Sequence, residues 1–146
     1  MTESCTGQPA VFEWPVRVYW EDTDAGGIVF YANYLKFMER ARTEWLRRLG
    51  IHQQFLAEQH GLMFVVTDAQ LRYLASARLD DTLLVGVEPL EIGRSRLRLR
   101  QCCRLAGQLL CEGTISVACI ERARHRPHRI PPDILARLSP QAATPE

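Results

Sequence analysis

The sequence predicts an α+β fold in which one long helix packs on an antiparallel sheet. Apolar residues recur every three or four positions over residues 33–49, and every second position from Leu62 onward. A single strand-like run, Val16–Trp20, precedes the helix. Because an amphipathic helix buries its apolar stripe against one face of a sheet, these elements are expected to share one core.

The chain length of 146 residues fits a single domain. We place this domain at residues 14–138, between a flexible N-terminal extension over 1–13 and a C-terminal tail over 139–146. No apolar run approaches the roughly 20 residues that span a bilayer, and Met1–Pro9 lacks the features of a signal peptide. A cytoplasmic location is therefore expected.

An acidic segment that contains glycines, Glu21–Gly27, follows the first strand. Acids and glycines commonly form turns. A carboxylate beside glycines and ahead of a helix also has the parts for acyl chemistry. The acid can attack or activate water, and the helix N-terminus can stabilise negative charge on a carbonyl oxygen. The local pattern leaves both interpretations open, and the turn is the commoner one.

The long helix is predicted over residues 33–49. Its apolar stripe consists of Tyr34, Phe37, Met38, Ala41, Trp45, Leu46 and Leu49. Asn33 is expected to be the N-cap, and Gly50 stands where a C-terminal cap belongs. A shorter helix is expected over Ile51–Gln59, ending near Gly61.

Four further strands follow in the second half of the chain. They are predicted over Phe64–Tyr73, from Thr82, over Arg96–Arg100 with one wet face, and over Leu109–Ile120. Gly93 and Gly107 stand between strands at hairpin-like spacing, which favours antiparallel pairing. One short helix is expected from Pro132. A single sheet around one helix leaves open edges, which oligomerisation would cover.

Charge and cysteine usage argue against several classes of protein. The net charge of +1 and the lack of aromatic residues among the arginines do not favour nucleic-acid binding. The five cysteines form no C-x-x-C pair, and their odd number is a poor disulfide framework. Cys103, Cys111 and Cys119 are expected to be core residues. No metal or cofactor is expected, since His125 and His128 lack an acid that would complete a ligand set.

The block Trp14–Val29, followed by Tyr31, Tyr34 and Glu39–Glu44, resembles the hotdog-fold acyl-CoA thioesterases. More narrowly, it is similar to the YbgC group, associated with the tol–pal cell-envelope cluster, and to the 4-hydroxybenzoyl-CoA thioesterases. Residues 77–81 and 127–131 match the same family, so the resemblance covers nearly the whole chain. It implies a curved antiparallel sheet of about five strands around a central helix. It also implies dimers, usually assembled as homotetramers, with active sites at the dimer interface.

The reaction that the resemblance implies is hydrolysis of acyl-CoA thioesters to a free acid and coenzyme A. The catalytic aspartate of the family falls on Asp24, and the backbone N–H near Tyr31 would polarise the thioester carbonyl. The residues expected to border the substrate are Gly26, Gly27, Ile28, Val29 and Asn33. Asp24 would act as a nucleophile or as a base that activates water, and we favour the base.

Other polar residues receive supporting roles. Asp22 is expected to cap a turn or form an ion pair, and Glu39 to lie at an interface or in an ion pair. Tyr31 stands where many YbgC members have histidine, so the resemblance leaves the acyl preference open. The arginines Arg122, Arg124, Arg126 and Arg129 either contact coenzyme A phosphates or form a solvated rim, and the rim is favoured.

The sequence therefore predicts an enzyme that hydrolyses short-chain or small aromatic acyl-CoA thioesters and works as a homo-oligomer. The alternative is a non-catalytic hotdog module that binds an acyl carrier protein or a tol–pal-linked envelope partner. The intact segment Asp24–Gly27 favours the enzyme. A hotdog dehydratase would need a histidine near the start of the long helix, and the sequence has none there.

Overall fold

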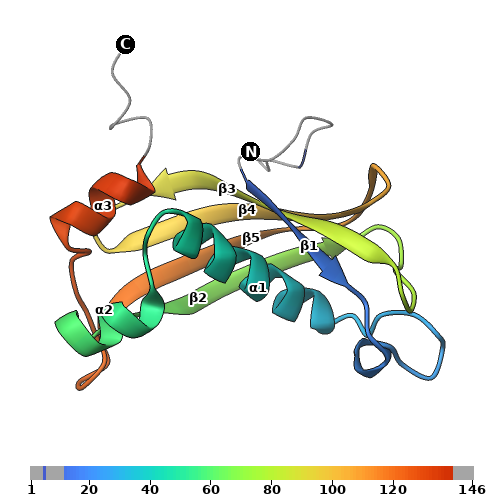
Figure 1. Ribbon diagram of the computed structural model, residues 1–146, viewed down its shortest axis with the longest axis horizontal. Coiled ribbons are helices and arrows are strands. Elements are labelled where there is room, and N and C mark those ends of the chain that lie inside the picture. Colours follow the sequence, from blue (N-terminus) through green and yellow to red (C-terminus); the bar gives the residue numbers. More distant parts are fainter. Residues whose placement is uncertain (1–4, 6–11, 140–146) are drawn as a thin grey trace, which may run out of the picture.

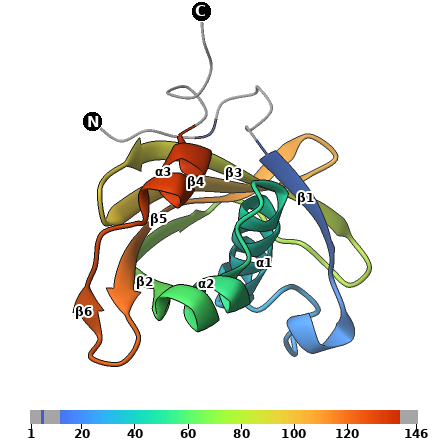
Figure 2. The same ribbon diagram turned by 60° about the vertical axis from the view of Figure 1, so that its left-hand side comes forward.

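The structure is a computed structural model that describes residue 5 and residues 12–139. One antiparallel sheet wraps around the helix α1 (Asn33–Arg48), as Figures 1 and 2 show. The long strands are β1 (Phe12–Arg17), β2 (Leu62–Tyr73), β3 (Thr82–Ile92), β4 (Arg96–Leu105) and β5 (Gln108–Glu121). The remaining elements are the turn η1 (Trp20–Asp22), the helices α2 (Gln53–His60) and α3 (Pro132–Leu138), and the short strand β6 (Arg126–Pro127).

The sheet has the strand order β1-β3-β4-β5-β2, and every pair is antiparallel. The short β6 pairs with the end of β5. Strands β1 and β2 therefore form the two edges, and α1 connects one edge to the other across the concave face (Figure 2). This arrangement confirms the α+β hotdog architecture that the sequence predicts.

The core lies between α1 and the concave face of the sheet. Phe37, Met38 and Ala41 of α1 are fully buried, as are Leu83 and Val85 of β3. Burying a large apolar side chain stabilises the fold by about 1.5–3 kcal/mol, so this contact holds the helix in place. After α1 ends, Gly50 takes φ +80, which confirms the expected cap. None of the described helices is long and apolar enough to cross a membrane.

The first strand differs from its predicted range. It begins at Phe12 and ends at Arg17, whereas the alternation predicted a strand up to Trp20. The carboxylate of Asp22 accepts the N–H of Tyr19 at 2.8 Å, which bends the chain into η1. Trp20 consequently lies on the surface, 82% exposed. The hydrogen bond between Asp22 and Tyr19 thus ends the strand earlier than the alternation of apolar residues predicts.

The convex face of the sheet is less exposed to solvent than the sequence predicted. Arg100 and Glu112 are buried there, although the arginine alternation indicates a wet face. The N–H of Cys5 donates to Glu112 Oε1 at 2.8 Å, and Cys5 forms a disulfide with Cys102, their Cα atoms 6.4 Å apart. The expectation of no disulfide is thus wrong. Residues 1–4, 6–11 and 140–146 of the expected extension and tail lie outside the described residues.

Candidate active site

The segment between η1 and α1 forms a tight hairpin-like loop. Thr23 pairs with Val29 in an isolated bridge. Within the loop, Asp24 N–H donates to Ile28 O at 2.9 Å, and Gly27 N–H donates to Asp24 O at 3.0 Å. Gly27 has φ +83, a conformation that strains any residue with a Cβ. The acidic segment is therefore a turn, and Asp24 stands at its first corner.

The carboxylate of Asp24 is exposed to solvent and held by its own loop. Its Oδ1 accepts the N–H of Gly26 at 2.8 Å. A Cβ added at Gly26 would lie 3.2 Å from that same oxygen, so a glycine keeps the approach open. Oδ2 accepts no hydrogen bond from the described residues. Asp24 thus has one fixed oxygen and one oxygen that can meet a substrate or a water molecule.

The neighbouring acid, Asp22, is buried and structural. Its side chain is the acceptor for Tyr19 N–H, and its backbone oxygen accepts the N–H of Phe30 at 2.9 Å. The same oxygen accepts Nδ2 of Asn33 at 2.9 Å. The side chain of Asn33 thus ties the loop to α1, of which Asn33 is the first residue. Ala32 occupies the N-cap position, without a side-chain hydrogen bond. The expectation that Asn33 caps the helix is wrong.

The start of α1 presents free hydrogen-bond donors. The N–H groups of Tyr31 and Ala32 find no acceptor among the described residues. Such donors at a helix N-terminus form a site for negative charge, which the helix dipole reinforces. Residues 23–29, which we call the Asp24 loop, lead directly into this turn of the helix (Figure 1).

A second segment, residues 74–81, supports the loop from the side. Val29 N–H donates to Ala77 O at 2.9 Å, and Ile28 pairs with Arg78 in an isolated bridge. Ala77 N–H in turn donates to the hydroxyl of Tyr34 at 3.1 Å. Since Tyr34 belongs to α1, this chain of hydrogen bonds fixes the loop relative to the helix. Burial raises the pKa of the Tyr34 hydroxyl, which therefore stays protonated.

Aromatic rings extend from the loop into the core. The ring centroids of Phe30 and Tyr31 lie 4.9 Å apart, and the ring of Tyr31 meets that of Tyr73 edge-on at 5.9 Å. Tyr73 lies 5.7 Å from Tyr34, which lies 5.8 Å from Phe37. We call these five residues the aromatic chain. Its outer members are exposed and its inner members are buried.

The predicted site residues therefore fall into two groups. Asp24, Gly26 and Gly27 lie exposed in the loop, and Tyr31 is exposed at the start of the helix. Ile28 is half-buried, whereas Val29 and Asn33 are buried, so these last two face the protein rather than the solvent.

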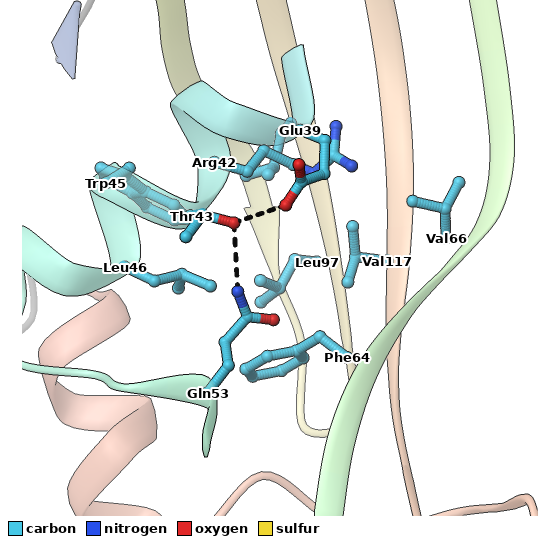
Figure 3. A pocket seen from close by; sticks show the side chains of 11 residues that line it. Glu39, Arg42, Thr43, Trp45, Leu46, Gln53, Phe64, Val66, Leu97 and Val117 are labelled. Atoms are coloured by element: carbon cyan, nitrogen blue, oxygen red, sulfur yellow. Dashed lines mark hydrogen bonds between the residues drawn. The ribbon is translucent and has the colours of Figure 1, made fainter. Parts of the chain in front are cut away.

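A cavity of about 210 Å³ opens between α1, the start of α2 and the concave face of the sheet (Figure 3). Its apolar lining consists of Trp45, Leu46, Phe64, Val66, Leu97, Leu99 and Val117. Neither Asp24 nor Tyr31 lines it. Its first helical lining residue, Glu39, lies about 9 Å along the helix axis from Asn33, the first residue of α1. The cavity is thus separate from the loop.

Polar side chains line one rim of this cavity. The Glu39 carboxylate accepts the hydroxyl of Thr43 at 2.6 Å, and that hydroxyl oxygen accepts Nε2 of Gln53 at 3.2 Å (Figure 3). Arg42 Nη1 donates to Oε1 of the buried Gln101 at 2.9 Å. Burial lowers the pKa of the Arg42 guanidinium, and the charge of Glu39 partly offsets this effect. Glu39 forms no ion pair with the described residues.

The C-terminal arginines lie far from the Asp24 loop. Arg122, Arg124, Arg126 and Arg129 are exposed around the β5–β6 turn, at the opposite end of the sheet (Figure 1). The length of the sheet therefore separates this turn from the Asp24 loop (Figure 1). Among the described residues there is no group of three side chains that could ligate a metal ion.

Sequence reasoning missed the site contributions of Tyr34 and Tyr73. Tyr34 was predicted as a core position of the helix and as part of the family resemblance, but not as a hydrogen-bond partner of residues 74–81. Tyr73 lies two residues after Leu71 on β2, so both side chains point to the same face of the sheet, but the contact of Tyr73 with Tyr31 joins residues far apart in the sequence.

Comparisons with known proteins agree on one family. A family model described as the thioesterase-like superfamily matches residues 18–138. The chain is 42% identical over 125 residues to the acyl-CoA thioesterase YbgC of Haemophilus influenzae, covering 86% of this chain and 92% of the relative. It is 41% identical over 129 residues to the acyl-CoA thioester hydrolase YbgC of Escherichia coli O157:H7, and the match covers 88% of this chain and 96% of that relative. A probable thioesterase from Bartonella henselae is similar in structure, with a TM-score of 0.78, 30% identity and coverage of 82% of this chain and 98% of that one.

Proposed function

The chain belongs to the thioesterase-like superfamily and is a thioesterase, and on that premise we propose that it hydrolyses short-chain or small aromatic acyl-CoA thioesters to a free acid and coenzyme A. One observation carries this proposal for the site. The exposed carboxylate of Asp24 lies in a loop that leads into a helix start with free N–H groups. This is the pairing of an attacking group with a site for developing negative charge that acyl transfer needs.

We assign the oxyanion site to the N–H groups of Tyr31 and Ala32. A thioester carbonyl oxygen that accepts these hydrogen bonds gains negative charge as the carbon becomes tetrahedral. Donors that are already fixed in position stabilise this charge without reorganising. The helix dipole of α1 adds to the effect within its first turn.

We assign Asp24 the role of general base. Its free oxygen Oδ2 takes a proton from water while the water oxygen bonds to the carbonyl carbon. The carbon–sulfur bond then breaks, and the proton passes to the departing thiolate of coenzyme A. Asp24 could instead attack the carbon itself and form a mixed anhydride that water hydrolyses. The hydrogen bond from Gly26 leaves Oδ2 available for either route, and we favour the base.

We further propose that the enzyme is a homo-oligomer, a dimer or a tetramer, with its active sites at an interface. The edge strand β2 has 12 residues, and its second half is largely exposed in the single chain. A long unpaired edge is a ready template for pairing with another strand. The site is also open, because Asp24 and Tyr31 are both exposed.

The deciding experiment measures thiol release from a panel of acyl-CoA esters by the wild type and by Asp24→Asn. We expect hydrolysis by the wild type and a loss of about 100-fold or more in kcat for the variant, the scale for removing a general base. Asp133→Asn, an exposed acid on α3, is the matched control and should keep wild-type activity.

Equal activity of the wild type and Asp24→Asn would defeat the assignment of Asp24. If no acyl-CoA and no acyl carrier thioester is hydrolysed, the chain would instead be a binding module for an acyl carrier or an envelope partner.

A further inference from the structure

The convex face of the sheet carries a covalent link that lies outside the core. The disulfide joins Cys5 to Cys102 in the middle of β4, 97 residues later in the chain. Neither cysteine belongs to the apolar cluster between α1 and the concave face, whereas the free cysteines Cys103, Cys111 and Cys119 all do. The core is therefore complete without this bond, and the sheet can stay folded when the bond opens.

A buried carboxylate on the same face orients Cys5 beside its partner. Glu112 of β5 stands opposite Cys102 in the strand register, and both residues are buried. Its Oε1 accepts the N–H of Cys5 at 2.8 Å, and its Oε2 forms an ion pair with Arg72 of β2. Because Arg72 holds the other oxygen of this carboxylate, Glu112 is a fixed acceptor that keeps the backbone of Cys5 next to Cys102.

We propose that Cys5 and Cys102 form a reversible redox switch. The disulfide form attaches Cys5 to the convex face, and the dithiol form releases it. In reducing compartments, disulfides are usually transient or redox-sensing rather than permanent. The inference goes beyond the proposed function, because the pair lies on the face of the sheet opposite α1 and the cavity. It controls the stability of the fold, not the thioester chemistry.

The oxidant in this switch is a low-molecular-weight disulfide such as oxidised glutathione. Cys5 is half-buried and more accessible than Cys102, so its thiolate attacks one sulfur of the oxidant and releases one glutathione thiolate. The thiolate of Cys102 then attacks the sulfur of Cys5 and releases the second. The two protons of the cysteines pass to the two glutathione thiolates, so the protein loses two electrons and two protons. Reduced glutathione reverses both steps.

The test equilibrates the full chain with oxidised or with reduced glutathione, alkylates the free thiols after denaturation, and determines the mass and the melting temperature. We expect three alkylated cysteines in the oxidised protein and all five in the reduced one. The oxidised form should melt about 5–10 °C higher, since the bond restricts the unfolded chain. Cys5→Ser should melt like the reduced wild type under both conditions. Cys119→Ala, which lacks a free core thiol, is the matched control and should keep the difference.

The positioning role of Glu112 has its own readout, the equilibrium between dithiol and disulfide in glutathione buffers. Glu112→Leu should lower the equilibrium constant for disulfide formation by about 10-fold, because the acceptor for Cys5 N–H is lost. Glu112→Gln keeps an acceptor oxygen and should lower it less.

Three results would overturn the switch. These are five alkylated cysteines under both conditions, equal melting temperatures of the two wild-type forms, and a disulfide that links two chains and doubles the mass. An unchanged equilibrium constant in Glu112→Leu would overturn the positioning role. Cys102→Ser provides a second variant without the bond, for which the same melting behaviour as in Cys5→Ser is expected.

Discussion

Two carboxylates that stand two residues apart in the sequence have separate tasks in the structure. Asp22 is buried and binds backbone N–H of Tyr19, whereas Asp24 is exposed and bound only by Gly26. The buried acid shapes the loop, and the exposed acid is available to substrate. We therefore expect the stability of the loop to depend on Asp22 and the proposed chemistry on Asp24.

The local pattern favoured a turn, and the family resemblance assigned Asp24 as the reactive acid, a role that stays a prediction. Asp22 was predicted to have a structural role, and its buried hydrogen bond to Tyr19 N–H agrees with that. Asn33 shows where local reasoning fails at this scale. Its type favours an N-cap, but its side chain reaches the backbone oxygen of Asp22, eleven residues earlier in the chain. Gln101 was overlooked for the same reason, since its partner Arg42 lies on α1. Contacts between distant segments leave no local pattern to read.

The buried thiol of Cys103 predicts a pH dependence of stability. Cys103 faces Cys111 across β4 and β5, and its hydrogen bond with Cys111 and its burial raise its pKa well above the ordinary 9.0. In the unfolded chain the thiol ionises near pH 9, while the folded thiol stays neutral. Its stabilising contribution is thus complete below pH 9 and is lost as the pH rises, by up to about 1.4 kcal/mol per unit.

We expect Cys103→Ala to lose less unfolding free energy than the wild type between pH 8 and pH 10, measured by urea denaturation. Val85→Ala is the control, because Val85 pairs with Cys103 in the sheet and does not titrate. It should lower stability at both values and keep the wild-type slope. Parallel curves for Cys103→Ala and the wild type would contradict the prediction.

At the scale of the elements, α1 is joined to the sheet by polar as well as apolar contacts. Gln101 of β4 is fully buried, accepts Arg42 Nη1 and donates to Met38 O at 3.0 Å. The amide thus satisfies a half-buried guanidinium and a helix carbonyl at once. A buried charged group left without its partner destabilises the fold.

We expect Gln101→Leu to lower the free energy of unfolding by about 2 kcal/mol, since Arg42 then lacks its acceptor. Adding Arg42→Met should recover part of this loss, because the uncompensated charge is gone. Chemical denaturation of both single variants and the double variant gives the coupling energy. Gln53→Leu, on the exposed rim, should change stability by less than about 0.5 kcal/mol. Strictly additive effects of the two substitutions would refute the link.

The elements were predictable to different degrees. The period of apolar residues located α1, and Gly50 and Gly61 marked the ends of both early helices. The long strands after Leu62 were also found from their alternation. The end of β1 was misplaced, because Tyr19 and Trp20 alternate like strand residues although Asp22 turns the chain. Periodicity alone cannot locate the end of a strand where a side-chain hydrogen bond bends the backbone.

At the scale of the whole molecule, several acids gather near the candidate site, where Arg17 pairs with Asp80 and Arg78 pairs with Ile28 of the loop. The β5–β6 turn, which carries exposed arginines, lies at the other end of the sheet (Figure 1). The net charge of +1 does not reveal that the arginines of the turn and the acids of the loop lie far apart. If these arginines contact the phosphates of coenzyme A, they must do so for a site on another subunit.

The proposed assembly gives a prediction at this scale. Val66 on the edge strand β2 is exposed in the single chain, and a charge placed on an edge strand opposes pairing with another edge. We expect the wild type to be oligomeric in light scattering and Val66→Lys to be monomeric, with reduced thiol release. Phe55→Lys on α2 should keep the wild-type mass. A monomeric wild type with full activity, or an oligomeric Val66→Lys, would contradict the proposal.

The strand order also determines which strands lack a pairing partner while the chain is still being synthesised. β1 pairs with β3, and β2 pairs with β5, so the first half of the chain contains no strand that pairs with another in that half. The Asp24 loop and the apolar stripe of α1 emerge before the sheet that will cover them. Non-local pairing of this kind slows folding. β2 therefore stays unpaired until β5 has been synthesised, whereas the apolar stripe of α1 can be covered as soon as β3 has emerged. A strand edge that stays unpaired for so long exposes the nascent chain to aggregation.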